Sequence, residues 1–427
     1  MYFRPIGKTV GLRLAEVPRH LQILAGPRQV GKTTLIRQIL ADRDINSSTY
    51  VSADPGSSSL ELGSQDFSTS AIVSSKSGAL NAAWLIDKWQ RALVAARDWT
   101  ALKDSRGLQL SPYLFVVDEI QKIPNWSETI KGLWDANVGD MRPMHLVLLG
   151  SSPLLMQQGL SESLAGRFEL IRMSHWSFEE MNDAFGLNLD QFIYFGGFPG
   201  SAGWIRDEAR WRNYVADSLI APIIEKDILQ MTRVDQPALL KQLFEIGCSY
   251  SGQIVALDKV LGVLNSKGNT VTLSRYLELL DRAGLLGGLP KYSSHELRQR
   301  RSPPKFQVRN TALISAMDAY SFEQARADRS YWGRLVESAV GAHLCNAADA
   351  NMKVHYWREG PLEVDFVLSD GKHLVAIEVK SGRGAAGTMP GLNEFSRRHE
   401  GCRVLVVGGE ALPVGEFLRY APSHWLN

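Results

Sequence analysis

The sequence predicts an α/β protein that begins with a parallel sheet and crossover helices. Over the first 150 residues, strand-like apolar runs alternate with segments of helical periodicity, the pattern of such sheets. The runs Leu114–Val117 and Leu146–Leu149 are entirely apolar, as expected for central strands covered on both faces. A further apolar run, Leu21–Ala25, is followed by a glycine-containing loop and then by a helix with one apolar face.

The loop after the first strand carries a phosphate-binding motif. Residues 26–33 read Gly-Pro-Arg-Gln-Val-Gly-Lys-Thr, which satisfies G-x-x-x-x-G-K-[ST] in the strand–loop–helix context that the motif requires. Its backbone N–H groups would point at phosphate oxygens at a helix N-terminus. We expect Lys32 to reach the β- and γ-phosphates and Thr33 to join a Mg²⁺ shell. The predicted nucleotide contacts are Gly26, Pro27, Arg28, Gln29, Val30, Gly31, Lys32, Thr33, Thr34 and Ser151.

Two adjacent acids follow the apolar run Leu114–Val117. Asp118 is placed to hold Mg²⁺ through water, and Glu119 to orient or deprotonate an attacking water. Because this pair suits water activation, it favours ATP hydrolysis over phosphate transfer to an acceptor. The sequence therefore predicts an ATPase that uses ATP and Mg²⁺.

Two further residues are candidates for contacts with the γ-phosphate. Ser151 follows the apolar run Leu146–Leu149 and can sense the phosphate at the carboxyl edge of the sheet, with an ordinary serine-rich turn as the alternative. Arg167 can stabilise phosphoryl charge from within the chain or from a neighbouring subunit. A surface salt bridge is the alternative for Arg167, and action in trans would require a homo-oligomer.

A second group of charged residues lies near the C-terminus, on strands predicted over 354–368 and 373–380. Alternation places Glu378 and Lys380 on one face of the second strand, and it places Asp365 opposite buried neighbours such as Phe366. Carboxylates from adjacent strands beside a lysine can bind a divalent metal, and the lysine can steady a nucleophilic water. We expect Asp365 and Glu378 to be ligands of a possible second metal. Glu337, on a preceding helix, adds a further acid; the alternative is a solvated face of an edge hairpin.

Composition places the chain among ordinary globular proteins. With 427 residues, 44% hydrophobic and 22% charged, it can form two to four domains. No run of 18 apolar residues occurs and residues 1–8 lack a signal-peptide core, so we expect a cytoplasmic protein without a membrane partner. Its three cysteines lack metal-ligand spacing. The stretch from residue 291 to residue 309 contains six basic residues and one acidic residue, which predicts DNA contact or a solvated linker.

Taken together, the motifs resemble a known family, the prokaryotic AAA-type P-loop ATPases whose C-terminal domain of unassigned function is related to PD-(D/E)XK nucleases. The resemblance rests on the phosphate loop, Asp118–Gln121, Gly150–Ser152, Ser163–Arg167, Ser177–Glu180, Gly196–Pro199, Glu337, Glu363–Asp365 and Glu378–Lys380. It implies that Asp118 and Glu119 belong to the ATP site and that Glu337, Asp365, Glu378 and Lys380 occupy nuclease-type positions. Phe306–Asn310 departs from the family pattern, which usually shows an Asp in a Tyr/Phe-x-x-Asp stretch at this place.

The resemblance also implies a division into domains. An AAA-type P-loop ATPase domain would cover 1–175, a helical lid or linker 176–230, a small winged-helix-like domain 231–292, and an α/β nuclease-like domain 300–427. One predicted function is an ATPase that couples nucleotide state to DNA handling through the last two domains. The other is a nucleotide-gated protein-interaction switch with a catalytically silent nuclease-like domain. DNA, a protein partner and a homo-oligomer therefore remain open as partners beside ATP.

Overall fold

The computed structural model describes residues 2–54, 80–106, 111–136, 144–150, 163–229, 234–264, 269–293, 302–382 and 389–426. The chain divides into two compact units, Met1–Met173 and Ser174–Asn427. Ser151 and the serine-rich segment 55–78, both singled out in the sequence, lie outside the described residues. Within the described part of the chain, no helix is long and apolar enough to cross a membrane.

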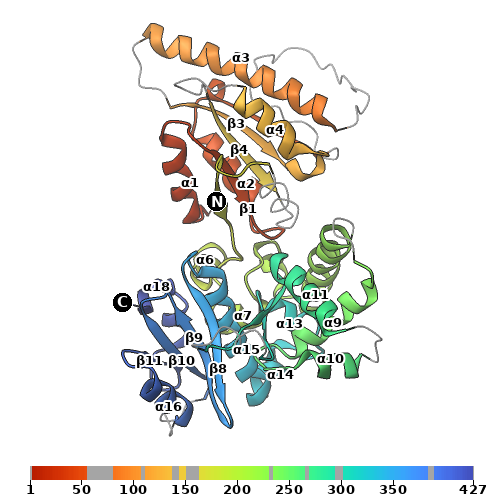
Figure 1. The fold of residues 1–427 in the computed structure, drawn as a ribbon, viewed down its shortest axis with the longest axis vertical. Coiled ribbons are helices and arrows are strands. Elements are labelled where there is room, and N and C mark those ends of the chain that lie inside the picture. Colours follow the sequence, from red (N-terminus) through yellow and green to blue (C-terminus); the bar gives the residue numbers. More distant parts are fainter. Residues whose placement is uncertain are drawn as a thin grey trace. The chain divides into compact units, whose positions relative to one another are not determined.

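The N-terminal unit is built on a five-stranded parallel sheet with the order β2-β3-β4-β1-β5 (Figure 1). Its strands are β1 (Leu21–Ala25), β2 (Ser48–Ser52), β3 (Tyr113–Asp118), β4 (Met144–Gly150) and β5 (Phe168–Arg172). The helices are α1 (Ile6–Ala15), α2 (Lys32–Ala41), α3 (Ala82–Arg106) and α4 (Trp126–Asp135), with short 3₁₀ turns at Ile45–Ser47 and Ile120–Lys122. The predicted α/β architecture of this part is confirmed.

Alternate side chains of the central strands pack into two separate cores. In β3, Leu114 and Val116 join the core under α1 and α2, whereas Phe115 and Val117 join the core under α3 and α4. Both faces of the sheet are therefore covered, which explains why the sequence of this strand is apolar at every position.

The C-terminal unit begins with helices. They are α6 (Phe178–Phe185), α7 (Leu189–Phe195), η3 (Pro199–Trp204), α8 (Glu208–Asn213), η4 (Tyr214–Ile220), η5 (Ile223–Ile228), α9 (Pro237–Ser249), α10 (Leu257–Val263) and α11 (Thr270–Arg282). An antiparallel pair follows, β6 (Leu286–Leu289) with β7 (Lys305–Val308). This pair joins residues that lie on either side of the predicted boundary near 292–300.

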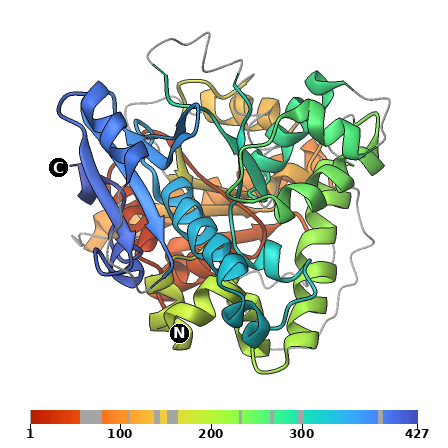
Figure 2. The same ribbon diagram turned by 90° about the horizontal axis from the view of Figure 1, so that it is seen from below.

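The rest of this unit is a four-stranded sheet with helices. Its strands, in the order β11-β10-β9-β8, are β8 (Lys353–Glu359), β9 (Leu362–Ser369), β10 (Leu374–Lys380) and β11 (Arg403–Gly408). The helices are α13 (Ala312–Ser315), α14 (Phe322–Ala327), α15 (Arg329–Ala347), α16 (Pro390–Arg398), α17 (Val414–Phe417) and α18 (Ser423–Leu426). Helix α15 contacts both β7 and β10, and Figure 2 shows it beside the blue strands.

The structure corrects two expectations about this sheet. The single pattern at 354–368 is two strands, β8 and β9, which turn at Gly360 with φ of +58°. The register shifts between His355 and Trp357, so that one residue of β8, Tyr356, stands opposite two of β9, Asp365 and Phe366. Such a bulge breaks strict alternation and can bring two successive side chains to one face. Asp365 and Phe366, which alternation had separated, both contact Lys305.

Candidate functional site

The phosphate loop joins β1 to α2, and its glycines serve two different purposes. A Cβ atom on Gly26 would lie 2.0 Å from the carbonyl oxygen of Met173, so only glycine fits beside this backbone. Gly31 adopts φ of +91° at the start of α2, in the left-handed region that side chains rarely tolerate. Lys32 is 7% exposed, and its ammonium donates to the carbonyls of Gly26 at 2.8 Å and Pro27 at 2.7 Å. The loop thus holds the Lys32 ammonium against its own backbone carbonyls.

Asp118, at the carboxyl end of β3, connects the loop to the acid pair. Its Oδ2 accepts hydrogen bonds from the Thr33 hydroxyl at 2.7 Å and from the Tyr50 hydroxyl at 2.7 Å. Its Oδ1 accepts from the backbone N–H of Glu119 at 2.9 Å. The predicted partners Thr33 and Asp118 are therefore brought together although 85 residues separate them.

Tyr50 was not expected at this site. It lies on β2, which is hydrogen-bonded to β3 on the side away from β4. Burial and the charge of Asp118 raise the pKa of Tyr50, so its hydroxyl keeps the proton that it donates to the carboxylate. No motif identifies such a residue, because its position depends on the order of the strands.

Glu119 has an unusual backbone conformation. Its φ is +55°, in the left-handed region that costs a non-glycine residue on the order of 1–3 kcal/mol. The Gln121 side-chain amide donates to Oε2 of Glu119. Residues held in this region cluster at functional sites, where the surrounding structure aims a side chain. Glu119 thus leaves the strand in a different direction from Asp118, as separate roles for the two acids would require.

The donor set at this edge fits Mg²⁺. The ion prefers hard oxygen ligands and few protein groups, completing its shell with phosphate and water. Thr33 and Asp118 supply a hydroxyl and a carboxylate oxygen that already lie 2.7 Å apart. These two residues are therefore the ones that would hold the metal.

Arg167 lies at the end of the sheet where the strands begin, and the phosphate loop lies at the opposite end, where the strands finish. It precedes β5, and its carbonyl accepts from the N–H of Leu21, the first residue of β1. The five residues of β1 separate it from the loop by about 15 Å at the usual rise per strand residue. Its guanidinium forms a two-point salt bridge with Asp135 at 2.8 and 2.9 Å. The structure thus does not bring Arg167 to the ATP site of its own chain, and a role in trans stays a prediction.

The predicted C-terminal residues do converge, around a lysine that the sequence analysis had assigned to a basic surface stretch. The Nζ atom of Lys305, on β7, lies 2.5 Å from Oε1 of Glu337 on α15 and 3.7 Å from Oδ1 of Asp365 on β9. It also donates to the Asp365 carbonyl at 3.1 Å and lies 4.7 Å from the centre of the Phe366 ring. Its side chain has no exposed surface.

The other members of this acidic cluster are also engaged. Oδ2 of Asp365 accepts the N–H of Val379 at 2.8 Å, beyond the last ladder pair of β9 and β10. On β10, Lys380 donates to Glu378 at 2.7 Å, as their predicted common face requires.

Burial is the largest influence on the pKa values of Glu337, Glu378 and Lys305. Burial raises the pKa of Glu337 to about 7, with the Asp365 charge acting in the same direction and Lys305 opposing it. Burial and the Asp365 charge also raise the pKa of Glu378. For Lys305, burial lowers the pKa but the charges of Glu337 and Asp365 outweigh it, so the pKa is raised and the ammonium stays charged.

The described residues do not show the possible second divalent metal site. Among the described residues, no group of three or more His, Cys, Asp or Glu side chains is arranged to hold a metal ion. The ammonium of Lys305 lies between Glu337 and Asp365 instead.

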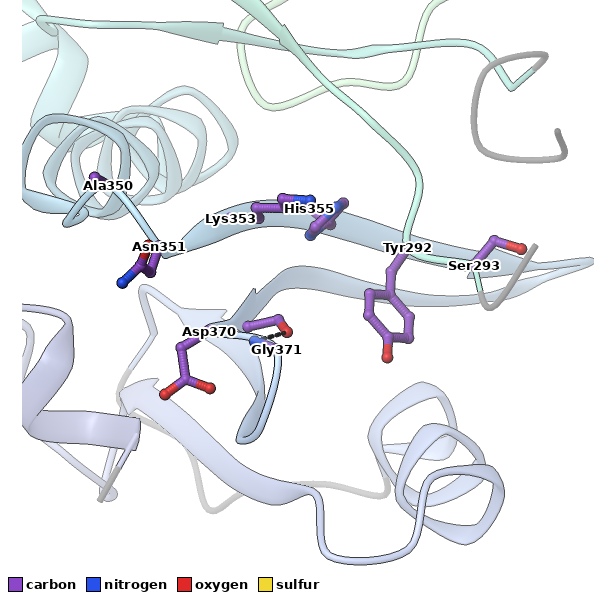
Figure 3. A pocket seen from close by; sticks show the side chains of 9 residues that line it. Tyr292, Ser293, Ala350, Asn351, Lys353, His355, Asp370 and Gly371 are labelled. Atoms are coloured by element: carbon purple, nitrogen blue, oxygen red, sulfur yellow. Dashed lines mark hydrogen bonds between the residues drawn. The ribbon is translucent and has the colours of Figure 1, made fainter. Parts of the chain in front are cut away.

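A hollow of about 490 Å³ lies elsewhere on the same unit (Figure 3). It is lined by Tyr292, Ser293, Ala350, Asn351, Lys353, His355, Ser369, Asp370 and Gly371. None of Glu337, Asp365, Glu378 and Lys380 lines it. The acidic cluster is therefore not the floor of this hollow.

The basic stretch 291–309 is only partly available to a partner. Lys305 is buried, and Arg309 pairs with Asp281 while its side chain is 14% exposed. Residues 294–301 lie outside the described residues. Asn310, in the stretch that departs from the family pattern, accepts the N–H groups of Gly197 and Ala312 at 3.1 Å and so serves the local fold.

Comparison with protein families agrees with the geometry of the N-terminal unit. Residues 18–182 match the AAA domain family. Over these residues the N-terminal unit is similar to AAA-type P-loop ATPase domains. Residues 186–324 and 332–425 match two domains of unknown function, DUF8612 and DUF4143. These AAA-domain boundaries contain Lys32, Thr33, Asp118 and Glu119, and the domain matches beyond it leave the winged-helix-like and nuclease-like folds as predictions.

Individual relatives are distant. Uncharacterized proteins of Mycobacterium bovis and Mycobacterium tuberculosis are each 26% identical over 366 residues, covering 84% of this chain and 69% of theirs. Among solved structures, a Walker-type ATPase of Pyrococcus abyssi has a TM-score of 0.47 and 14% identity, covering 73% of this chain and 94% of that one. AMPPCP-bound DnaA from Aquifex aeolicus has a TM-score of 0.29 and 13% identity, covering 66% and 89%. At these TM-scores the likeness adds nothing to the AAA match.

Proposed function

We propose that the AAA domain hydrolyses ATP with Mg²⁺ and that its nucleotide state controls the C-terminal unit. The observation that carries the first part is the 2.7 Å hydrogen bond between Thr33 and Asp118, which joins the phosphate loop to the acid pair. The loop N–H groups and Lys32 bind the β- and γ-phosphates, and Glu119 orients the attacking water and accepts its proton. Mg²⁺ held by Thr33 and Asp118 offsets phosphate charge when bound.

Phosphate release from ATP tests this proposal. Glu119→Gln keeps the shape of the side chain but removes the base, so we expect hydrolysis to fall about 100-fold or more while nucleotide binding persists. Glu179→Gln, at an exposed position on α6, is the matched control and should hydrolyse ATP like the wild type. Equal rates in Glu119→Gln and the wild type would sink the assignment.

The partner of the C-terminal unit is either DNA or another protein. Asp365, Glu378 and Lys380 come from adjacent strands, the arrangement that favours DNA handling by a nuclease-like domain. The ion pairs that bury Lys305 and Arg309 favour the other function, a nucleotide-gated protein-interaction switch, because they remove charge that DNA would need. We favour the switch.

Cleavage and binding assays discriminate between the two. We expect no cleavage of duplex or single-stranded DNA with Mg²⁺ or Mn²⁺, and ATP hydrolysis that DNA does not stimulate. Cleavage that Asp365→Ala and Lys380→Ala both abolish would establish the nuclease instead. Salt-dependent DNA binding without cleavage would support DNA handling by a silent domain.

A further inference from the structure

We infer that Lys305 is a built-in cation that takes the place of a divalent metal in the acidic cluster of Glu337, Asp365 and Glu378. The C-terminal unit then works without a metal ion. This inference deepens the interaction-switch form of the proposed function and does not depend on ATP hydrolysis.

Each carboxylate of the acidic cluster has an ammonium group or a peptide N–H of the chain beside it. Glu337 pairs with Lys305 at 2.5 Å, and Glu378 with Lys380 at 2.7 Å. Asp365 has the Val379 N–H on one oxygen and the Lys305 ammonium 3.7 Å from the other. A hard cation needs several carboxylate oxygens free to coordinate it. Here the ammonium of Lys305 lies between Glu337 and Asp365, where a metal that both residues bind would have to lie.

The position of Lys305 is fixed by backbone pairing and by the burial of its side chain. It belongs to β7, pairs with Leu289 of β6 and bridges Ile254 on its other side. Its side chain is wholly buried, with the Phe366 ring 4.7 Å from the ammonium. Withdrawing it would leave Glu337 as a largely buried charge without its partner, which is strongly unfavourable. The lysine is therefore part of the fold and not an exchangeable counter-ion.

The same contacts connect three elements. Lys305 comes from the β6–β7 hairpin, Glu337 from α15 and Asp365 from β9. A metal would connect only its ligands, whereas this lysine ties the hairpin covalently to the centre of the acidic cluster. These ion pairs thus hold the β6–β7 pair against α15 and the four-stranded sheet.

Titration of full-length protein with Mn²⁺, followed by electron paramagnetic resonance, tests the inference. Asp118→Ala is included throughout and nucleotide is omitted, so that the ATP site contributes no metal. With Lys305 in place we expect no bound Mn²⁺. Lys305→Met keeps the length of the side chain but not its charge. This variant should bind one Mn²⁺, with an affinity at least about tenfold higher than that of protein with Lys305. Adding Asp365→Asn should abolish that gain.

Two results would overturn the inference. One is Mn²⁺ bound to protein that retains Lys305 and lost on Asp365→Asn. The other is a folded Lys305→Met variant that gains no metal. If Lys305→Met does not fold, the Lys305→Met/Glu337→Gln double variant should fold, because it removes both charges; failure of the double variant alone to fold would also count against the pairing. None of these readouts involves ATP turnover, so a failure here is distinct from a failure of the ATPase assignment.

Discussion

The ATP site and the C-terminal acidic cluster both place an aspartate on a strand, but they surround it with different donors. Asp118 is contacted by the hydroxyls of Thr33 and Tyr50 and by a peptide N–H, all of them neutral. In the acidic cluster, Asp365 accepts a peptide N–H and also lies 3.7 Å from the ammonium of Lys305. Glu337 pairs with Lys305, and Glu378 pairs with Lys380. Neutral donors position a carboxylate and leave its charge for a metal, whereas cationic donors consume that charge. We propose that this difference gives two similar sequence signals different chemistry.

The largest expected effect comes from removing the buried cation. Lys305→Met should lower the free energy of unfolding by about 3–5 kcal/mol, because it leaves Glu337 without its partner. Urea unfolding measures this, and Lys305→Met/Glu337→Gln should recover most of the loss. Lys241→Met is the control, since Lys241 pairs with Glu225 at 2.7 Å on the surface and should cost less than about 1 kcal/mol. Equal losses in the two single variants would contradict the contrast.

A smaller effect is expected at the neutral donors of the ATP site. Tyr50→Phe removes a hydrogen bond to the Asp118 carboxylate and should cost about 1.5–3 kcal/mol of stability. It should also lower ATP hydrolysis at limiting Mg²⁺ by about tenfold, because the carboxylate loses its support. Tyr113→Phe removes a neutral hydrogen bond to Thr49, so it should cost about 1 kcal/mol and leave hydrolysis unchanged. Matching losses of hydrolysis in both variants would show that Tyr50 has no special role.

The smallest effect is a pH dependence. The raised pKa of Glu337, about 7 against an ordinary 4.5, means that the folded chain keeps a proton that the unfolded chain loses. This group's contribution to stability is therefore complete below about pH 4.5 and is lost as the pH rises through about 7. Unfolding measured at pH 5 and pH 8 should show a smaller decline in Glu337→Gln than in the wild type. The residual decline belongs to Glu363 and Glu378, whose pKa values burial also raises. If stability falls as much between pH 5 and pH 8 in Glu337→Gln as in the wild type, Glu337 is not a cause of the pH dependence.

What the sequence could predict was local. Apolar runs and the phosphate motif identified the parallel sheet, the loop and the acid pair, because each signal lies within a few consecutive residues. Tyr50 was missed because its contact with Asp118 depends on β2 lying beside β3. For Arg167 the motif left open a role at the phosphates and a surface salt bridge. The register of β5 against β1 puts it at the end of the sheet where the strands begin, where it pairs with Asp135.

Lys305 shows the same limit more clearly. In the sequence it belongs to a run of basic residues, which usually marks a solvated segment. Its burial follows from the pairing of β7 with β6 and from α15 packing against β7, contacts that no local pattern encodes. The bulge in β9 that brings Asp365 and Phe366 to the same lysine is equally invisible to strict alternation.

The most direct test of this contrast counts metal ions on one chain. Full-length protein saturated with a non-hydrolysable ATP analogue is titrated with Mn²⁺, and bound metal is measured by electron paramagnetic resonance. The account predicts one Mn²⁺ per chain, lost in Asp118→Ala and unchanged in Asp365→Ala. A second bound Mn²⁺, or one that survives Asp118→Ala and disappears in Asp365→Ala, would contradict it.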